Sequence, residues 1–171
     1  SENIIKTAHR GENMPLSFSQ QRLWFINQMD PGNTAYNSPW PIRLEGKLDI
    51  EALQQAIDLT VERHEILRTT YASKGGKPQQ LIHANARIKV EVEEMFGATE
   101  VELQENISIK AHKVFDLATG PLMRAYVLSY AEDAQVFFMV SHHINTDAWS
   151  NAVLLKELAS SYNSFVNGGE T

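Results

Sequence analysis

The sequence predicts an α+β fold in which a mixed β-sheet is covered by helices on one side. Two observations carry this prediction: segments of alternating apolar and polar residues are interspersed with segments of helical spacing, and two pairs of strand-like segments are joined by short turns. A chain of 171 residues with 43% hydrophobic residues can form one domain or one lobe of a larger one. Residues 1–14 are polar and predict a lead-in or linker, so residues 15–171 are the expected folded unit.

The folded unit is expected to begin with a helix and an edge strand. Ser17 or Ser19 can cap a helix from about residue 20 to residue 29, with Leu23 on its inner side. Apolar residues then alternate with polar ones over residues 40–45, as in a strand. Prolines in that segment favour an edge or the start of a strand.

A second helix and a hairpin follow. Asp49 is a suitable N-cap for a helix whose apolar side chains recur every three or four residues up to His64. Residues 67–72 and 79–83 predict two short strands that pair through the glycine-containing turn between them. The sequence therefore predicts a helix packed on the sheet and a β-hairpin.

The remaining elements lead to the most polar turn of the chain. Alternation over residues 88–92 predicts a half-exposed strand, and Thr99 with Glu102 forms a capping box for a helix whose apolar side extends to Phe115. Residues 123–141 predict a second hairpin. A last helix, with Trp149, Val153, Leu155, Leu158, Ala159, Tyr162 and Val166 at helical spacing, is expected to end at Gly168-Gly169.

Composition excludes several classes of function. The net charge of −6 and the absence of a basic cluster argue against nucleic acid or an anionic membrane as partner. The chain has no cysteine, so it forms neither disulfides nor thiolate metal sites. The polar N-terminus lacks the apolar core of a signal peptide, and no apolar run reaches 18 residues. We therefore expect a cytoplasmic protein.

The segment 136–150 concentrates the residues that could perform chemistry. An apolar strand delivers His142 and His143, and Asp147 follows just before the last helix. Successive side chains on a strand point to opposite faces, so one histidine is expected to face a cleft and the other to be held in the fold. Imidazole titrates near neutral pH, and a nearby carboxylate can fix its tautomer, so the pattern suits acid and base chemistry.

Other interpretations of the same residues remain open. His142 could be a core histidine and His143 a surface one, with Asp147 merely capping the helix. Two imidazoles and a carboxylate could also bind zinc, although adjacent histidines on a strand diverge and a third ligand with useful spacing is missing. A serine nucleophile is disfavoured because Ser141 and Ser150 lack a nucleophile-elbow sequence.

Arg68 lies in an otherwise apolar and threonine-rich strand-like segment, where a charge needs a partner. Asp147 is the candidate carboxylate for an ion pair with it. The aromatic residues Trp24, Phe25 and Trp149 are interpreted as core or lobe-interface residues.

Four stretches, in the same order, resemble the N-terminal lobe of a condensation domain of nonribosomal peptide synthetases. They are Leu16-Ser-Phe-Ser-Gln-Gln-Arg-Leu-Trp-Phe25, Arg63-His-Glu-Ile-Leu-Arg-Thr-Thr-Tyr71, Phe115-Asp-Leu-Ala-Thr-Gly-Pro-Leu-Met-Arg124 and Ser141-His-His-Ile-Asn-Thr-Asp-Ala-Trp-Ser150. The last resembles the His-His-x-x-x-Asp-Gly motif of the family. The resemblance covers nearly the whole chain from Pro15.

The resemblance implies a fold like that of chloramphenicol acetyltransferase, with two lobes around a tunnel. It also implies amide formation between a donor aminoacyl or peptidyl thioester and the amine of an acceptor aminoacyl group. Both substrates would arrive on phosphopantetheine arms of carrier proteins, with no cofactor bound to this chain. By the motif, His143 is catalytic, as a base toward the amine or by positioning it, while His142, Asp147 and Arg68 are structural. The opening motif resembles domains that accept an L-configured donor.

Two departures from the family pattern qualify this expectation. Ala148 stands where the family has glycine, at the turn formed with Trp149 and Ser150, and its methyl group could narrow the tunnel or alter the turn. The C-terminal lobe is missing, so we expect a folded piece with little activity alone and an exposed apolar face where that lobe would dock. A relative that forms esters or acylates a free acceptor, and a noncatalytic platform that binds carrier proteins, are the alternatives.

Overall fold

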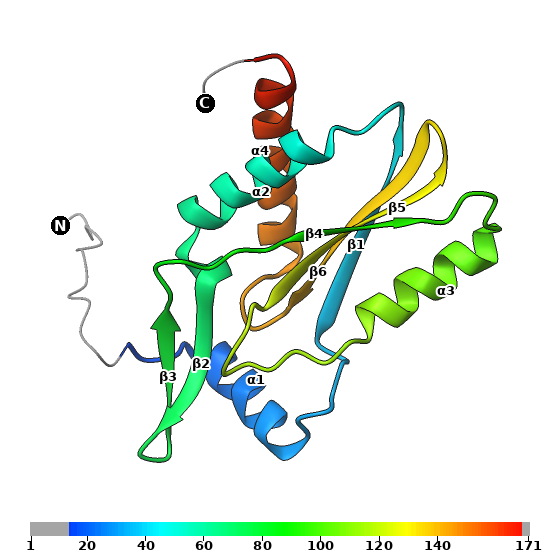
Figure 1. Ribbon diagram of the computed structural model, residues 1–171. Coiled ribbons are helices and arrows are strands. Elements are labelled where there is room, and N and C mark those ends of the chain that lie inside the picture. The colour runs from blue at the N-terminus through cyan, green and yellow to red at the C-terminus, as the bar shows by residue number, and fades with distance from the viewer. Residues whose placement is uncertain (1–13, 169–171) are drawn as a thin grey trace.

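The computed structural model describes residues 14–168 (Figure 1). The expected lead-in lies outside these residues except for Met14, which forms an isolated antiparallel bridge to Gln80. In chain order the elements are α1 (Phe18–Met29), β1 (Asn37–Glu45), α2 (Ile50–Arg63), the 3₁₀-helix η1 (Glu65–Arg68), β2 (Thr69–Lys74), β3 (Lys77–Ile82), β4 (Val90–Glu94), α3 (Glu100–Ala111), β5 (Met123–Ala131), β6 (Ala134–His142) and α4 (Ala148–Val166).

A four-stranded sheet in the order β1-β6-β5-β4 organises the molecule. Strands β1, β6 and β5 pair antiparallel, whereas β4 pairs parallel to β5, so the sheet is mixed as predicted. Strand β1 lies at one edge, which suits Pro39 and Pro41 because proline has no N–H to donate to a neighbour. The sheet therefore confirms both the mixed class and the edge position of the first strand.

Strand β6 contributes side chains to two apolar clusters on opposite faces of the sheet. Phe138 and Val140 belong to the cluster that α3 covers, whereas Phe137 and Met139 belong to the cluster that α2 and α4 cover (Figure 1). The expectation of helices on one side only is therefore wrong. Strand β6 is buried from Gln135 onward without alternation, and a strand that is apolar on both faces needs a cover on each side.

Helices α2 and α4 pack together on one face. The carboxylate of Asp49 caps α2 as predicted, accepting hydrogen bonds at 3.0 Å from the N–H groups of Glu51 and Ala52. At the other end of α2, the Nε2 atom of His64 lies 2.7 Å from the Oε2 atom of Glu157 in α4. The buried stripe of α4 differs from the predicted one and consists of Asn151, Leu154, Leu158 and Ser161.

The predicted first hairpin forms a separate two-stranded sheet from β2 and β3. Its first strand begins at Thr69, two residues after the predicted start, because Leu67 and Arg68 belong to the 3₁₀-helix η1. The backbone N–H of Tyr71 donates to the carbonyl of Leu117 at 2.7 Å, which attaches this hairpin to the loop before β5. The hairpin is thereby fixed beside the end of β6.

Helix α1 lies on the surface, with Leu23 and Trp24 only partly buried against the core. Ser17 accepts from the N–H of Gln20, and the Gln20 side chain accepts from the N–H of Ser17, so a capping box starts the helix. None of its residues is buried, and Phe18 is 91% exposed. Helix α3 also begins with the predicted capping box but ends at Ala111, so Phe115 reaches the core from a loop.

Candidate functional site

The two adjacent histidines lie at the end of β6 and separate as the alternation of a strand requires. His142 is the last residue of β6 and is only 3% exposed, whereas His143 follows the strand and is exposed. One imidazole is therefore part of the fold and the other faces solvent. His142 matches the expectation of one histidine held in the fold, whereas the cleft expected beside the other histidine stays a prediction.

His142 is held as a neutral imidazole. Its Nδ1 atom accepts the backbone N–H of Ile144 at 3.1 Å, and its ring lies 6.2 Å, centroid to centroid, from the ring of Phe115. Burial, followed by the neighbouring charge of His143, lowers the pKa of His142 to about 4. Because Nδ1 is an acceptor, the remaining proton of the neutral ring is on Nε2.

His143 is oriented by two backbone carbonyls. The backbone N–H of His143 donates to the carbonyl of Tyr36 at 2.9 Å. The Nδ1 atom of its ring lies 3.1 Å from the carbonyl oxygen of Thr146. A carbonyl oxygen only accepts, so Nδ1 carries the proton and the lone pair of the neutral ring is on Nε2. Within residues 14–168, no hydrogen bond is formed by Nε2. The ring can therefore act as a base or an acceptor toward a group outside the turn.

Asp147 caps helix α4. Its Oδ1 atom accepts from the backbone N–H of Ser150 at 2.8 Å and from the Ser150 hydroxyl at 2.5 Å. The hydrogen bonds from the hydroxyl and from the N–H are the main causes that hold the pKa of Asp147 below its usual value, and the charge of His143 adds a smaller effect. The carboxylate thus fixes the start of α4 directly after the histidine turn.

The predicted ion pair between Arg68 and Asp147 does not form in this structure. The guanidinium of Arg68 instead lies 3.6 Å from the carboxylate of Glu65 and donates to the carbonyl of His83 at 2.9 Å. Arg68 ends a 3₁₀-helix and turns toward the loop after β3, while Asp147 is occupied by its capping hydrogen bonds. Arg68 therefore lies at a different site from His143.

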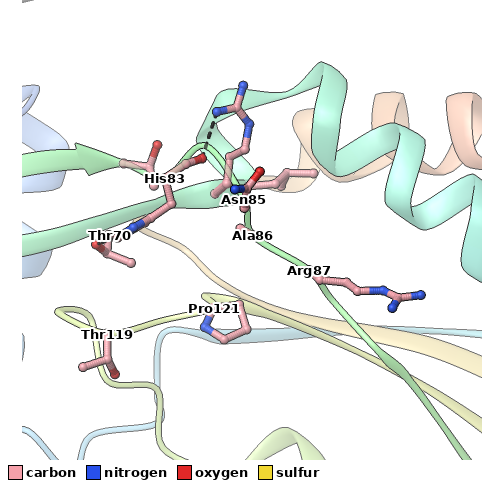
Figure 2. A pocket seen from close by; sticks show the side chains of 10 residues that line it. Thr70, His83, Asn85, Ala86, Arg87, Thr119 and Pro121 are labelled. Atoms are coloured by element: carbon pink, nitrogen blue, oxygen red, sulfur yellow. Dashed lines mark hydrogen bonds between the residues drawn. The ribbon is translucent and has the colours of Figure 1, made fainter.

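Arg68 lines a cavity of about 230 Å³ between β2, the loop after β3 and the loop before β5. Figure 2 shows Thr70, His83, Thr119 and Pro121 around it. The hydroxyl of Thr70 lies 2.7 Å from Nε2 of His83. The lining of this cavity mixes polar side chains with Leu67, Ala86 and Pro121, and neither His143 nor Asp147 contributes to it.

The other predicted turn residues lie at the N-terminus of α4. Ala148 is its first residue, and no residue other than glycine has a positive φ within the described range 14–168. Alanine is therefore free of left-handed backbone strain at this position. Trp149 is 81% exposed beside the turn, and Ser150 completes the capping box of Asp147.

Two further contacts of the site were not predicted from the sequence. The hydroxyl of Thr146 donates to the hydroxyl of Ser141 at 2.7 Å inside the turn, and Tyr36 supplies the carbonyl that holds the backbone of His143. The presence of a hydroxyl in each of Ser141 and Thr146 could have suggested the first contact. The contact of Tyr36 is formed by its backbone carbonyl, so it does not depend on the residue type and could not be predicted from the sequence.

Within the described range, no helix is both long and apolar enough to cross a membrane. The same residues contain no group of three or more histidine, aspartate or glutamate side chains placed to hold a metal ion.

The sequence matches known proteins along nearly its whole length. The family model described as Condensation domain matches residues 11–171. One of the linear gramicidin synthase proteins of Brevibacillus parabrevis is 38% identical over 161 residues, which cover 91% of this chain and 3% of that protein. Chondramide synthase cmdD of Chondromyces crocatus is 39% identical over 156 residues, which cover 89% of this chain and 4% of that protein. The chain thus spans a small fraction of the relatives that it matches.

Solved structures share the fold. The X-domain in its complex with OxyB from teicoplanin biosynthesis superposes with a TM-score of 0.86 at 28% identity, over 95% of this chain and 35% of that one. The starter condensation domain of rhizomide synthetase RzmA gives 0.87 at 19% identity, over 94% of this chain and 41% of that one. The sheet and its covering helices thus form the fold of a condensation domain. The family match places this chain in the condensation-domain family of nonribosomal peptide synthetases.

Proposed function

We propose that this chain supplies the histidine-bearing part of a site that forms amide bonds in nonribosomal peptide synthesis. In this reaction the amine of an acceptor aminoacyl group attacks the thioester carbon of a donor aminoacyl or peptidyl group. Each substrate is carried on the phosphopantetheine arm of a carrier protein, and no cofactor is bound to this chain. The family match and the similarity to gramicidin and chondramide synthases support the proposal.

The observation that carries the proposal is the orientation of His143. The carbonyl of Thr146 holds the proton of the ring on Nδ1, so Nε2 presents its lone pair outward. As the C–N bond forms and the C–S bond breaks, Nε2 either takes a proton from the attacking nitrogen or holds that nitrogen by accepting its hydrogen bond. The departing thiolate takes up a proton. Holding two tethered substrates at reacting distance supplies much of the rate.

The other site residues have supporting roles in the proposal. His142 is a neutral buried ring beneath the turn, Asp147 fixes the helix that follows it, and Arg68 holds the loop after β3. A second lobe completes the site, because the chain spans only 35% to 41% of the solved structures described above. We place the reaction in the cytoplasm and favour an L-configured donor.

The direct test is dipeptide formation from donor- and acceptor-loaded carrier proteins. Three proteins are compared: the 171-residue chain, the complete protein with its second lobe, and the complete protein with His143→Ala. We expect product only from the complete wild-type protein, with a loss of about a hundredfold or more in rate on substitution. Ala148→Gly is the matched variant in the same turn, and it is expected to retain activity because it leaves both histidines unchanged.

The outcomes separate the parts of the proposal. Equal rates with and without His143 would remove this residue from the reaction. Product from the 171-residue chain alone would show that the second lobe is dispensable. Alcohol or free-amine acceptors that outperform a carrier-bound acceptor would identify an ester-forming or free-acceptor relative, and faster turnover with a D-configured donor would overturn the donor assignment.

A second candidate function is a noncatalytic platform that binds proteins. Two observations favour it: alanine replaces the motif glycine at position 148, and the X-domain, which was solved in a complex with OxyB, is 28% identical to this chain. Binding of carrier proteins that survives His143→Ala, together with no condensation by the folded complete wild-type protein, would support this function and exclude the first.

A further inference from the structure

A partly buried chain of hydrogen bonds joins three segments that are far apart in the sequence. The side-chain amide of Gln20 in α1 donates to the hydroxyl of Tyr71 in β2 at 2.9 Å. The hydroxyl of Tyr71 donates to Oδ1 of Asn145 in the histidine turn at 2.7 Å. Tyr71 is 1% exposed, so its hydroxyl has these partners in place of bulk water.

The direction of this chain follows from its inner end. The Nδ2 atom of Asn145 lies 2.6 Å from the carbonyl oxygen of Ile66 and 3.3 Å from that of Thr69. These carbonyls only accept, so the amide nitrogen of Asn145 faces them and its oxygen faces Tyr71. The Tyr71 hydroxyl then accepts from Gln20 and donates to Asn145 at 2.7 Å, with the carbonyl oxygen of Ile144 as a more distant second acceptor at 3.4 Å. Both acceptors of the Tyr71 hydroxyl, Asn145 and Ile144, belong to the histidine turn.

Asn145 lies in the middle of the turn that carries the proposed catalytic histidine. It is two residues after His143 and two residues before Asp147. Its backbone N–H donates to the carbonyl of His142 at 3.0 Å, and the next carbonyl, that of Thr146, orients the ring of His143. A displacement of the Asn145 side chain would therefore move the acceptor that fixes the tautomer of His143.

We propose that Tyr71, bridging Gln20 and Asn145, is a positioning residue for His143. The assignment of a reaction to His143 rests on the function proposed above, but the effect on the orientation of its ring does not. Burial is the main cause that raises the pKa of Tyr71, so its hydroxyl keeps the proton that it donates. Tyr71 acts through the backbone of the turn and touches no substrate.

The molecule offers a matched control for Tyr71. Tyr126 is also buried, belongs to the same apolar cluster, and its hydroxyl has no hydrogen-bond partner within residues 14–168. Tyr71→Phe and Tyr126→Phe therefore remove the same atom from similar surroundings. Only the first removes a hydrogen bond to the turn.

The first measurement is independent of activity. Nitrogen chemical shifts of the imidazole of His143, recorded by NMR on the 171-residue chain, distinguish the Nδ1–H from the Nε2–H tautomer. We expect the Nδ1–H form in the wild type and in Tyr126→Phe, and a mixture of tautomers in Tyr71→Phe and in Asn145→Ala. Unchanged tautomer populations in both of these variants, with the protein folded, would overturn the proposal.

The second measurement uses the complete protein in the dipeptide assay, well below its melting temperature. Tyr71→Phe is expected to lower kcat by about tenfold with KM for the loaded carriers unchanged, because the positioning of a reacting group affects the chemical step. Tyr126→Phe is expected to match the wild type. Reduced stability of Tyr71→Phe with an unchanged kcat and tautomer would show a merely structural role and overturn the proposal.

The two proposals fail in distinguishable ways. If the complete wild-type protein makes no product but Tyr71→Phe changes the tautomer of His143, the proposed function fails and the positioning role stands. If the wild type is active and neither the tautomer nor kcat changes in Tyr71→Phe, the positioning role fails and the function stands.

Discussion

At the scale of single residues, His142 couples stability to pH. Its pKa is about 4 in the folded chain, against about 6.5 for an unperturbed histidine. Between these values the unfolded chain binds the proton and the folded chain does not, so stability is full above about pH 6.5 and falls as the pH drops toward 4. This shift corresponds to about 3 kcal/mol, since one pKa unit is about 1.4 kcal/mol.

Urea denaturation at pH 7 and at pH 4.5 would test this coupling. His142→Asn lowers stability at pH 7, because it removes a packed ring, but it should lose less stability than the wild type on acidification. His112→Asn is the matched control at an exposed histidine, and its pH dependence should follow the wild type. Equal acid losses in the wild type and in His142→Asn would contradict the assignment.

Gly120 gives a second prediction at this scale. Its φ is +63°, and an added Cβ atom would lie 2.8 Å from Cγ2 of the buried Thr70. Gly76 has a φ of +76° in the turn between β2 and β3, with nothing within 4 Å of an added Cβ atom. Both alanine variants incur about 1 kcal/mol or more of left-handed strain, and only Gly120→Ala adds a clash. Thermal unfolding should show the larger loss for Gly120→Ala, and equal losses would refute the clash.

The opposite orientations of His142 and His143 could be predicted from the sequence, whereas the partners of Arg68 and Asp147 could not. Strand alternation is enough to expect the two histidine side chains to point to opposite faces, because that depends only on local geometry. The expected Arg68 and Asp147 pair does not form, because ion pairing depends on which partners the surroundings offer to each side chain. Arg68 contacts Glu65 and a backbone carbonyl, and Asp147 caps the N-terminus of α4.

At the scale of elements, the capping residue of α2 should contribute measurably to stability. Asp49 accepts two backbone N–H groups, at 3.0 Å each, that would otherwise lack partners. Asp49→Ala is expected to cost about 1 kcal/mol, and Asp49→Ser should retain most of the stability because serine can accept the same hydrogen bonds. Urea midpoints of the two variants compare these costs. A serine variant as unstable as the alanine variant would argue against capping.

Helix starts are predicted better than helix faces and strand neighbours. Asp49 and Thr99 indicate their helices by residue type, since few side chains can accept an N–H at an N-terminus. The predicted stripe of α4 shares only Leu158 with the buried one, because several adjacent apolar residues satisfy a helical period equally well. The sequence analysis did not predict that α3 covers the face of the sheet opposite to α2 and α4. Burial of a sheet on both faces depends on tertiary packing.

At the scale of the whole molecule, the two apolar clusters should unfold together. Phe137 and Phe138 are consecutive in β6 but belong to clusters on opposite faces of one sheet. Phe137→Ala and Phe138→Ala are each expected to cost about 3–5 kcal/mol. Because one strand serves both clusters, each variant should lower the midpoint of a single urea transition that is coincident by fluorescence and circular dichroism.

Phe18→Ser is the control for this comparison, because Phe18 is 91% exposed and its loss should change stability by less than about 0.5 kcal/mol. Two separate transitions in either core variant would show that the faces of the sheet unfold independently.

A mixed sheet is expected from the hairpins and helices in the sequence. The parallel pairing of β4 with β5 could not be predicted, because the two segments share no local sequence signature.

Helix α1, which buries none of its residues, has a consequence for the turn that it helps to hold. Elements with little buried surface open locally at a lower free energy than the whole fold, so the amide hydrogens of α1 should exchange with deuterium before those of β6. Each such opening detaches Gln20 from Tyr71. A neighbouring protein that binds α1 and prevents its local opening would therefore hold Gln20 on Tyr71 and restrict the turn of His143 without touching it, which is a form of allosteric control.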